Sequence, residues 1–291
     1  MSLQIAVATE DLAGPLRNAL DRAARLKVDG VRLNSRSELD IARASDSELR
    51  QMLHYARERQ LQIAGLLCPV RHALYEEQYL EPRLEVLRQT MAAARKLRTK
   101  DVIVRCGSIP SEQTSSTKEP TTADSFETLF GVSSAPAEKS PQAQFTLLCE
   151  LLNDLTGYGN HVGCVLNLIL TDYNAPGLQQ LLAEVKNGPC RIVFDPATAV
   201  MNQADPEDVF RTLYDHIGYL RARDAGTNLD GGGLEVAVGD GNVDWLQLLP
   251  TITEAEFPGW VCVERTGGDS RAADVAKGLQ TIRQFVPQAE N

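Results

Sequence analysis

The chain has 291 residues, of which 43% are hydrophobic, and its formal net charge is -10. The acidic surplus would repel a nucleic-acid backbone, and no run approaches the roughly 18 apolar residues of a membrane span. The N-terminal segment is acidic where a signal peptide would be basic. We therefore expect a cytoplasmic protein with neither nucleic-acid nor membrane partners.

Short β-type runs alternate with amphipathic helical patterns along the whole chain. We expect strands over 4–9, 30–34, 62–68, 101–106, 163–170, 191–195, 218–224 and 259–264. We expect helices over 14–25, 46–59, 81–97, 141–155, 177–185, 206–216, 243–253 and 271–285. Eight such repeats predict an α/β protein, a single (β/α)8 TIM barrel over 1–291, because each parallel crossover needs a helix and eight strands close the sheet. An open doubly wound sheet is the alternative, but no glycine-rich phosphate loop follows the first strand.

One segment breaks this alternation. Residues 107–140 are rich in Ser, Thr, Pro and Glu and poor in periodic apolar residues. We interpret them as an extended loop after the fourth strand, which would leave the barrel at the face where active sites lie. A lid and a disordered insertion are both consistent with this composition.

Charged residues close three apolar strands in the last third of the chain. RIVFD ends on Asp195, GYLRARD contains Arg221 and Asp224, and WVCVE ends on Glu264. Burial of an unpaired carboxylate costs several kcal/mol, so such residues belong to a site, an ion pair or a solvent-facing position. Because barrel strands end at a common face, the sequence predicts one cluster of these charges.

Several stretches resemble the xylose isomerase-like barrel superfamily of sugar isomerases, sugar-phosphate epimerases and related endonucleases. In that superfamily the seventh strand reads H-x-K-D, a loop G-x-G-x-V-D-W follows, and the last strand ends in a metal-binding glutamate. The corresponding stretches here are GYLRARDAG, GDGNVDW and GWVCVERTGGD, and RIVFDPATAV and ARKLRTKDVIVRCGSIP resemble the sixth- and fourth-strand regions. The resemblance implies carbohydrate metabolism, with an isomerase or epimerase acting on a small sugar, polyol or sugar phosphate.

The resemblance also implies a divalent metal ion, held partly by Asp195 and Glu264. Other ligand positions differ: Thr198 and Arg221 stand where histidines are expected, and Asn167 or Ile169, depending on register, stands at the fifth-strand glutamate. Guanidinium has no lone pair for a metal. We therefore predict a degenerate metal site in which Arg221 pairs with both carboxylates, and no cofactor. A divalent metal through Asp195 and Glu264 remains the alternative.

The catalytic candidates are Glu264, Asp195 and Arg221, with a carboxylate as the base. The alternative is a buried ion-pair cluster without a catalytic role. The substrate-binding candidates lie at or near strand ends and are Arg32, Arg71, His72, Arg105, Asn167 and Asp224. The arginines would clamp a phosphate or carboxylate, whereas Asp224 is equally consistent with a loop anchor. We also expect Asn242 or Asp240 to cap the helix that contains Trp245.

Two classes of function remain. One is an isomerase/epimerase-like enzyme, and the other is a non-enzymatic or ligand-binding barrel that has lost the ancestral metal site. An abasic-site endonuclease is disfavoured because that class needs several imidazole ligands and the chain has four histidines, none at a ligand position. The sequence leaves the substrate, its stereochemistry and the oligomeric state open, a homo-oligomer included.

Overall fold

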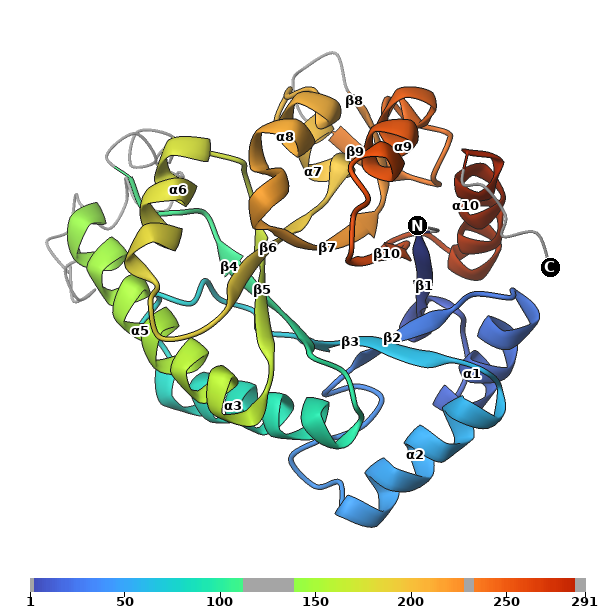
Figure 1. Ribbon diagram of the computed structural model, residues 1–291, viewed down its shortest axis with the longest axis horizontal. Coiled ribbons are helices and arrows are strands. Elements are labelled where there is room, and N and C mark those ends of the chain that lie inside the picture. Colours follow the sequence, from blue (N-terminus) through green and yellow to red (C-terminus); the bar gives the residue numbers. More distant parts are fainter. Residues whose placement is uncertain (1–2, 112–138, 228–232, 286–291) are drawn as a thin grey trace, which may run out of the picture.

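Eight parallel strands form a closed barrel in the computed structural model, which describes residues 3–111, 139–227 and 233–285. Around the barrel the order is β1-β10-β7-β6-β5-β4-β3-β2. The strands are β1 (Gln4–Ala8), β2 (Gly30–Asn34), β3 (Gln62–Cys68), β4 (Asp101–Gly107), β5 (Val165–Leu170), β6 (Cys190–Phe194), β7 (Ile217–Ala222) and β10 (Trp260–Val263). Figure 1 shows these strands at the centre with the helices around them. The predicted TIM barrel is confirmed, and the open doubly wound sheet is wrong.

The outer helices occupy the predicted segments with small shifts at their ends. They are α1 (Leu16–Arg25), α2 (Asp46–Glu58), α3 (Leu80–Lys96), α5 (Pro141–Val162), α6 (Ala175–Glu184), α8 (Pro206–Leu213), α9 (Trp245–Glu254) and α10 (Arg271–Phe285). Polar caps explain several starts: Ser45 forms a capping box with Glu48 before α2, and Asp205 caps α8 ahead of Pro206. Helix α5 extends beyond the predicted end at residue 155, and Gly163, with φ +82°, ends it in the left-handed conformation.

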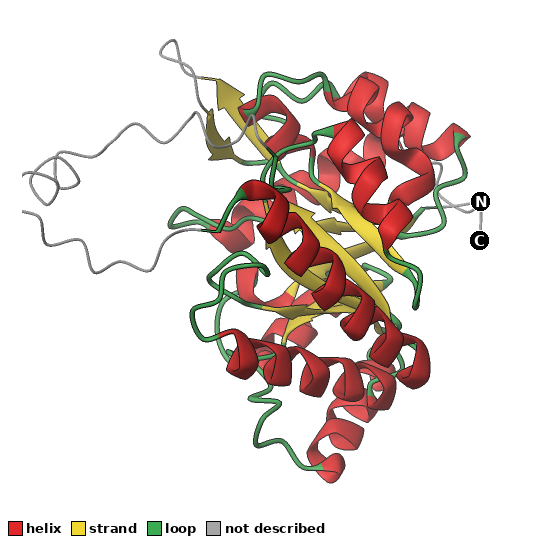
Figure 2. Ribbon diagram, turned by 90° about the vertical axis from the view of Figure 1, so that its left-hand side faces the viewer, coloured by secondary structure: helices red, strands yellow, loops and turns green. Residues whose placement is uncertain are grey.

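Two elements at the C-terminal side of the barrel were not predicted. A six-residue helix, α7 (Pro196–Met201), begins directly after β6 with Asp195 as its N-cap. A hairpin of β8 (Asp224–Thr227) and β9 (Gly233–Val236) follows β7. Figure 2 shows the hairpin standing clear of the barrel strands. It brings additional charged side chains to the ends of β6, β7 and β10.

The barrel has an inner and an outer apolar core. The inner cluster takes alternate strand residues, namely Ala6, Ala8, Ala64, Ile103, Val193, Tyr219, Trp260 and Cys262. The larger outer cluster packs the other strand faces against the helices. Because side chains alternate across a strand, residues two positions beyond an inner-cluster member also face the barrel axis. Arg105, Asp195, Arg221 and Glu264 occupy such positions.

No helix among the described residues is long and apolar enough to cross a membrane. Most of the predicted loop over 107–140 lies outside the described residues, so its interpretation as a lid or an insertion stays a prediction.

Candidate functional site

The three charged strand ends predicted to cluster lie together on the neighbouring strands β6, β7 and β10. Arg221 Nε donates a hydrogen bond to Glu264 Oε2 at 2.7 Å. Arg221 Nη1 lies 3.5 Å from Asp195 Oδ2. All three residues are at most 12% exposed at the side chain. The predicted pairing of Arg221 with both carboxylates is confirmed, whereas a catalytic role for these residues stays a prediction.

A second arginine engages the other oxygen of Glu264. Arg32 on β2 donates from Nε to Glu264 Oε1 at 2.8 Å, and its Nη2 bonds Glu10 Oε1 at 2.9 Å. Burial opposes the ionisation of Glu264, but the charges of Arg221 and Arg32 outweigh it and lower its pKa to about 2. Glu264 is therefore ionised at neutral pH, and both of its oxygens already accept hydrogen bonds from guanidinium groups.

A third arginine, Arg223, joins the cluster through the hairpin. Its Nη1 lies 2.6 Å from Asp195 Oδ2, and its Nε donates to Glu235 Oε1 on β9 at 3.0 Å. We call the set of Arg32, Arg221, Arg223, Asp195, Glu264, Glu10 and Glu235 the arginine network. Its three guanidinium groups and four carboxylates come from five barrel strands or their loops and from the hairpin. Arginine and carboxylate charges thus nearly balance at the barrel mouth.

Glu10, Arg223 and Glu235 were not among the predicted site residues. The spacing could have indicated Arg223 as a site residue, because it lies two residues beyond Arg221 and extended residues two apart point to the same side. Glu10 and Glu235 lie on a loop helix, η1 (Thr9–Asp11), and in the unpredicted hairpin. No periodic pattern in the sequence indicates that these two residues reach the barrel mouth.

Asp11 is a further acidic group beside the network that the sequence did not single out. Its carboxylate accepts hydrogen bonds from the backbone N–H of Arg265 at 2.9 Å and from Arg271 Nη1 at 3.1 Å. Burial raises the pKa of Asp11 to about 7; the bond from Arg265 opposes this rise and the charge of Glu264 adds to it. Burial thus favours the protonated form of Asp11 more than is usual for an aspartate.

Asp224 holds the loop that follows the hairpin. Its two oxygens accept hydrogen bonds from the backbone N–H groups of Ala225, Gly239 and Val243 and from Trp245 Nε1, at 2.8–3.1 Å. A Cβ on Gly241 would lie 2.1 Å from Asp224 Oδ1, which explains a glycine in the motif GDGNVDW. The structure thus shows the loop-anchor alternative for Asp224, whose oxygens are committed to the protein.

The predicted cap of the helix after this loop is wrong. Asp244, not Asn242 or Asp240, is the N-cap of α9 and accepts from the N–H of Gln247. Asn242 Oδ1 accepts from the backbone N–H of Thr227, and Asp240 pairs with Lys277. Both residues therefore fasten the loop to its neighbours.

Asn167 does not lie with the other predicted substrate-binding residues. It is fully buried and donates from Nδ2 to Asp101 Oδ1 at 3.0 Å, near the start of β4. Ile169, one layer further along β5, pairs in register with Arg105 and Val193. Ile169 is therefore the residue that stands at the mouth on β5, and it offers no polar group there.

The remaining candidates occupy the other side of the mouth. Arg105 on β4 faces the barrel axis from two residues beyond Ile103, and its side chain is exposed. Arg71 and His72 follow β3 and line a cavity beside α3. His72 Nδ1 lies 2.7 Å from Glu76 Oε2. Within the described residues, none of these three side chains forms a hydrogen bond or an ion pair with the arginine network.

The carboxylate oxygens at this site are not arranged to hold a divalent metal ion. Both oxygens of Glu264 and one oxygen of Asp195 are engaged by guanidinium groups, and the other Asp195 oxygen caps α7 through the N–H of Thr198. Arg221 places positive charge between the two carboxylates, where a cation would have to sit. Within the described parts of the chain, no group of three or more His, Cys, Asp or Glu side chains is arranged to hold a metal.

Comparisons with known proteins agree with the fold. No curated protein matches the chain. A xylose isomerase domain protein from Planctomyces limnophilus superposes with a TM-score of 0.77 at 16% identity, over 98% of both chains. The 3-keto-D-glucoside 4-epimerase of E. coli superposes with a TM-score of 0.72 at 11% identity, over 97% of this chain and 99% of the epimerase. A Mycobacterium smegmatis barrel solved in complex with magnesium has a TM-score of 0.71 at 15% identity, over 97% of this chain and 96% of its own.

At these identities the structural matches show the fold alone. The family model described as xylose isomerase-like TIM barrel matches residues 20–285, which is most of the chain. The chain belongs to the xylose isomerase-like TIM barrel family.

Proposed function

We propose that this protein binds a small sugar, polyol or sugar phosphate at the mouth of its barrel without a divalent metal ion. The ligand class is supported by structural neighbours whose names describe sugar epimerases. The main support for metal independence is that Arg221 and Arg32 each donate a hydrogen bond to one of the two oxygens of Glu264. A guanidinium group carries positive charge and hydrogen-bond donors in fixed directions, so it can bind an oxygen of the sugar. Unlike a metal ion, it needs no coordinating side chains.

The geometry favours binding over catalysis by Glu264. A general base needs a free lone pair and a pKa near the working pH. Glu264 does not meet the second requirement, because its pKa is about 2, and each of its oxygens already accepts a hydrogen bond from a guanidinium group. The expected role of Glu264 is therefore to hold Arg32 and Arg221 in position.

An isomerase or epimerase on the same ligand is the second candidate, and Asp11 is the observation that favours it. Its pKa of about 7 lets it take up and release a proton at neutral pH, next to the arginine network. In that case Asp11 would move the proton and the arginines would polarise the adjacent oxygen. Incorporation of solvent deuterium into the ligand by the parent, and its loss in Asp11→Asn, would favour this candidate over binding alone.

A thermal-shift screen of chelator-treated protein against sugars, polyols and sugar phosphates tests the proposal. We expect at least one compound to raise the melting temperature without added metal, because a ligand that binds the folded state stabilises it. If the ligand is a sugar phosphate, Arg105→Ala should remove the part of the shift that depends on the phosphate. Arg57→Ala, on the exposed side of α2, is the matched control and should leave the shift unchanged. Stabilisation only after Mg²⁺ or Mn²⁺ is added would contradict the proposal.

A further inference from the structure

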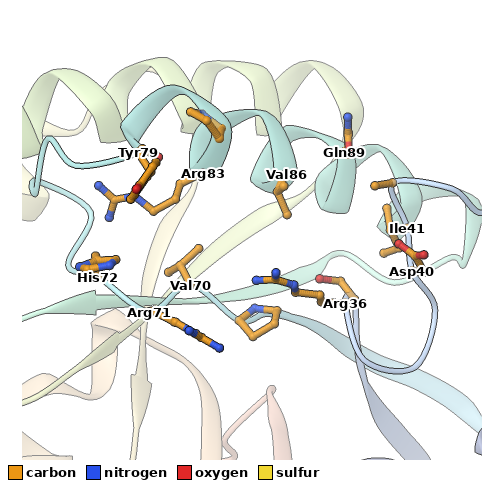
Figure 3. Close-up of a pocket in the computed structure, with 14 residues that line it drawn as sticks. Arg36, Asp40, Ile41, Val70, Arg71, His72, Tyr79, Arg83, Val86 and Gln89 are labelled. Atoms are coloured by element: carbon orange, nitrogen blue, oxygen red, sulfur yellow. The ribbon is translucent and has the colours of Figure 1, made fainter.

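A cavity of about 600 Å³ lies beside the barrel mouth, between α3 and the loops that follow β2 and β3. Figure 3 shows Val86 on α3 pointing toward the loop residues Val70 and Arg36. None of the residues that line the cavity belongs to the arginine network. The volume lies within the range of small-molecule sites, about 300–1,000 Å³. The cavity is therefore a separate candidate binding site.

The cavity concentrates positive charge in a chain whose net charge is -10. Arg36, Arg71 and Arg83 line it, together with His72 and a single acidic residue, Asp40. Asp40 is exposed and lies 3.7 Å from Arg43, so it is not held against the lining arginines. The local excess of guanidinium groups favours an anionic ligand.

The three arginines differ in how many donors they leave free. Arg83 is committed to the protein: its Nη1 donates to the carbonyl of Ala73 at 2.6 Å and its Nη2 to that of Glu76, which fixes the loop after β3 against α3. Arg36 and Arg71 are exposed, and within the described chain neither guanidinium group has an ion-pair or hydrogen-bond partner. Both lie on the loop side of the cavity (Figure 3). They can therefore bind a phosphate or carboxylate.

The rest of the cavity wall is apolar except for Ser35 and Gln89. Its apolar members are Ile41, Ala42, Pro69, Val70, Tyr79, Pro82 and Val86. Tyr79 and Val86 are also two of the four large apolar side chains that are exposed in the described structure, at 67% and 37%. Exposed apolar surface gathered in a concave site marks a place where an organic ligand removes it from water.

We propose that the cavity between α3 and the loops after β2 and β3 binds a small organic phosphate or carboxylate. Arg36 and Arg71 hold the anionic group, and the wall formed by Val70, Tyr79 and Val86 covers the organic body. This site does not depend on the function proposed for the arginine network. Its ligand class follows from free guanidinium groups beside an apolar wall, whereas each guanidinium group of the network is paired with carboxylates.

Calorimetric titration of the full chain with phenyl phosphate tests the site at low ionic strength. We expect saturable binding of one molecule per chain. Inorganic phosphate should bind about tenfold more weakly, because it leaves the apolar wall in water. Arg36→Ala and Arg71→Ala should each weaken phenyl phosphate binding by about tenfold or more, since each removes a charge-assisted contact.

Arg57→Ala is again the matched control, and it should bind phenyl phosphate as the parent does. Because Arg36 and Arg71 are exposed, their variants should keep the parent's melting temperature, which separates lost binding from lost folding. Absence of saturable binding by the parent would overturn the proposal. So would unchanged affinity in both arginine variants, or equal affinity for phosphate and phenyl phosphate. None of these results bears on metal independence at the barrel mouth.

Discussion

Glu264→Ala is expected to lower the free energy of unfolding by about 3–5 kcal/mol. Glu264 is 2% exposed and is the common partner of Arg32 and Arg221. Its removal leaves Arg32, itself 2% exposed, with Glu10 alone, and leaves Arg221 only a 3.5 Å contact with Asp195. Buried charge without full compensation is costly, and neither arginine can lose its proton to avoid that cost. Urea or guanidinium unfolding of the parent and the variant measures the difference.

Asp154→Ala is the control for this substitution. Asp154 pairs with Arg88 at 2.6 Å on the surface, where its side chain is 56% exposed. Exposed ion pairs contribute about 0–1 kcal/mol, so this variant should unfold nearly as the parent does. A loss below about 1 kcal/mol in Glu264→Ala as well would show that the network does not stabilise the barrel.

Asp224→Ala should cost about 3 kcal/mol of unfolding free energy. The carboxylate holds the loop between the hairpin and α9 through the N–H groups of Gly239 and Val243 and through Trp245 Nε1. The bonds to Val243 and Trp245 are buried, and water cannot replace the missing acceptor without opening the loop. Denaturant unfolding measures the loss, and the fluorescence of Trp245 should shift as its ring becomes hydrated.

Asp244→Ala, at the end of the loop that Asp224 anchors, gives the comparison for Asp224→Ala. Asp244 caps α9 through the exposed N–H of Gln247, and loss of an N-cap costs about 1 kcal/mol. Equal losses in the two variants would contradict the anchoring role of Asp224.

The barrel itself could be predicted from the sequence because its signals are local. Strands such as β3 and β10 are short apolar runs bounded by polar residues, and the helices between strands carry the 3.6-residue period. The hairpin was missed because β8 and β9 have four residues each and include glycines, so they lack both length and alternation. In the fold the hairpin packs against α7, the other element that was not predicted.

The candidate site could be predicted only where the residues lie on strands. Asp195, Arg221 and Glu264 end neighbouring strands, so the closed sheet alone brings them together. Asn167 was misplaced because alternation fixes which face a residue takes but not its depth along the barrel. That depth is set by the stagger between strands, which puts Ile169 at the level of Arg105.

Measurement of the metal content of protein purified without added metal tests metal independence most directly. With Arg221 and Arg32 on both oxygens of Glu264, we expect mass spectrometry to find far less than one divalent ion per chain. Treatment with a chelator should then leave the melting temperature unchanged. One Mg²⁺, Mn²⁺ or Zn²⁺ ion per chain in the parent, lost in Asp195→Asn and Glu264→Gln variants that still fold, would contradict metal independence.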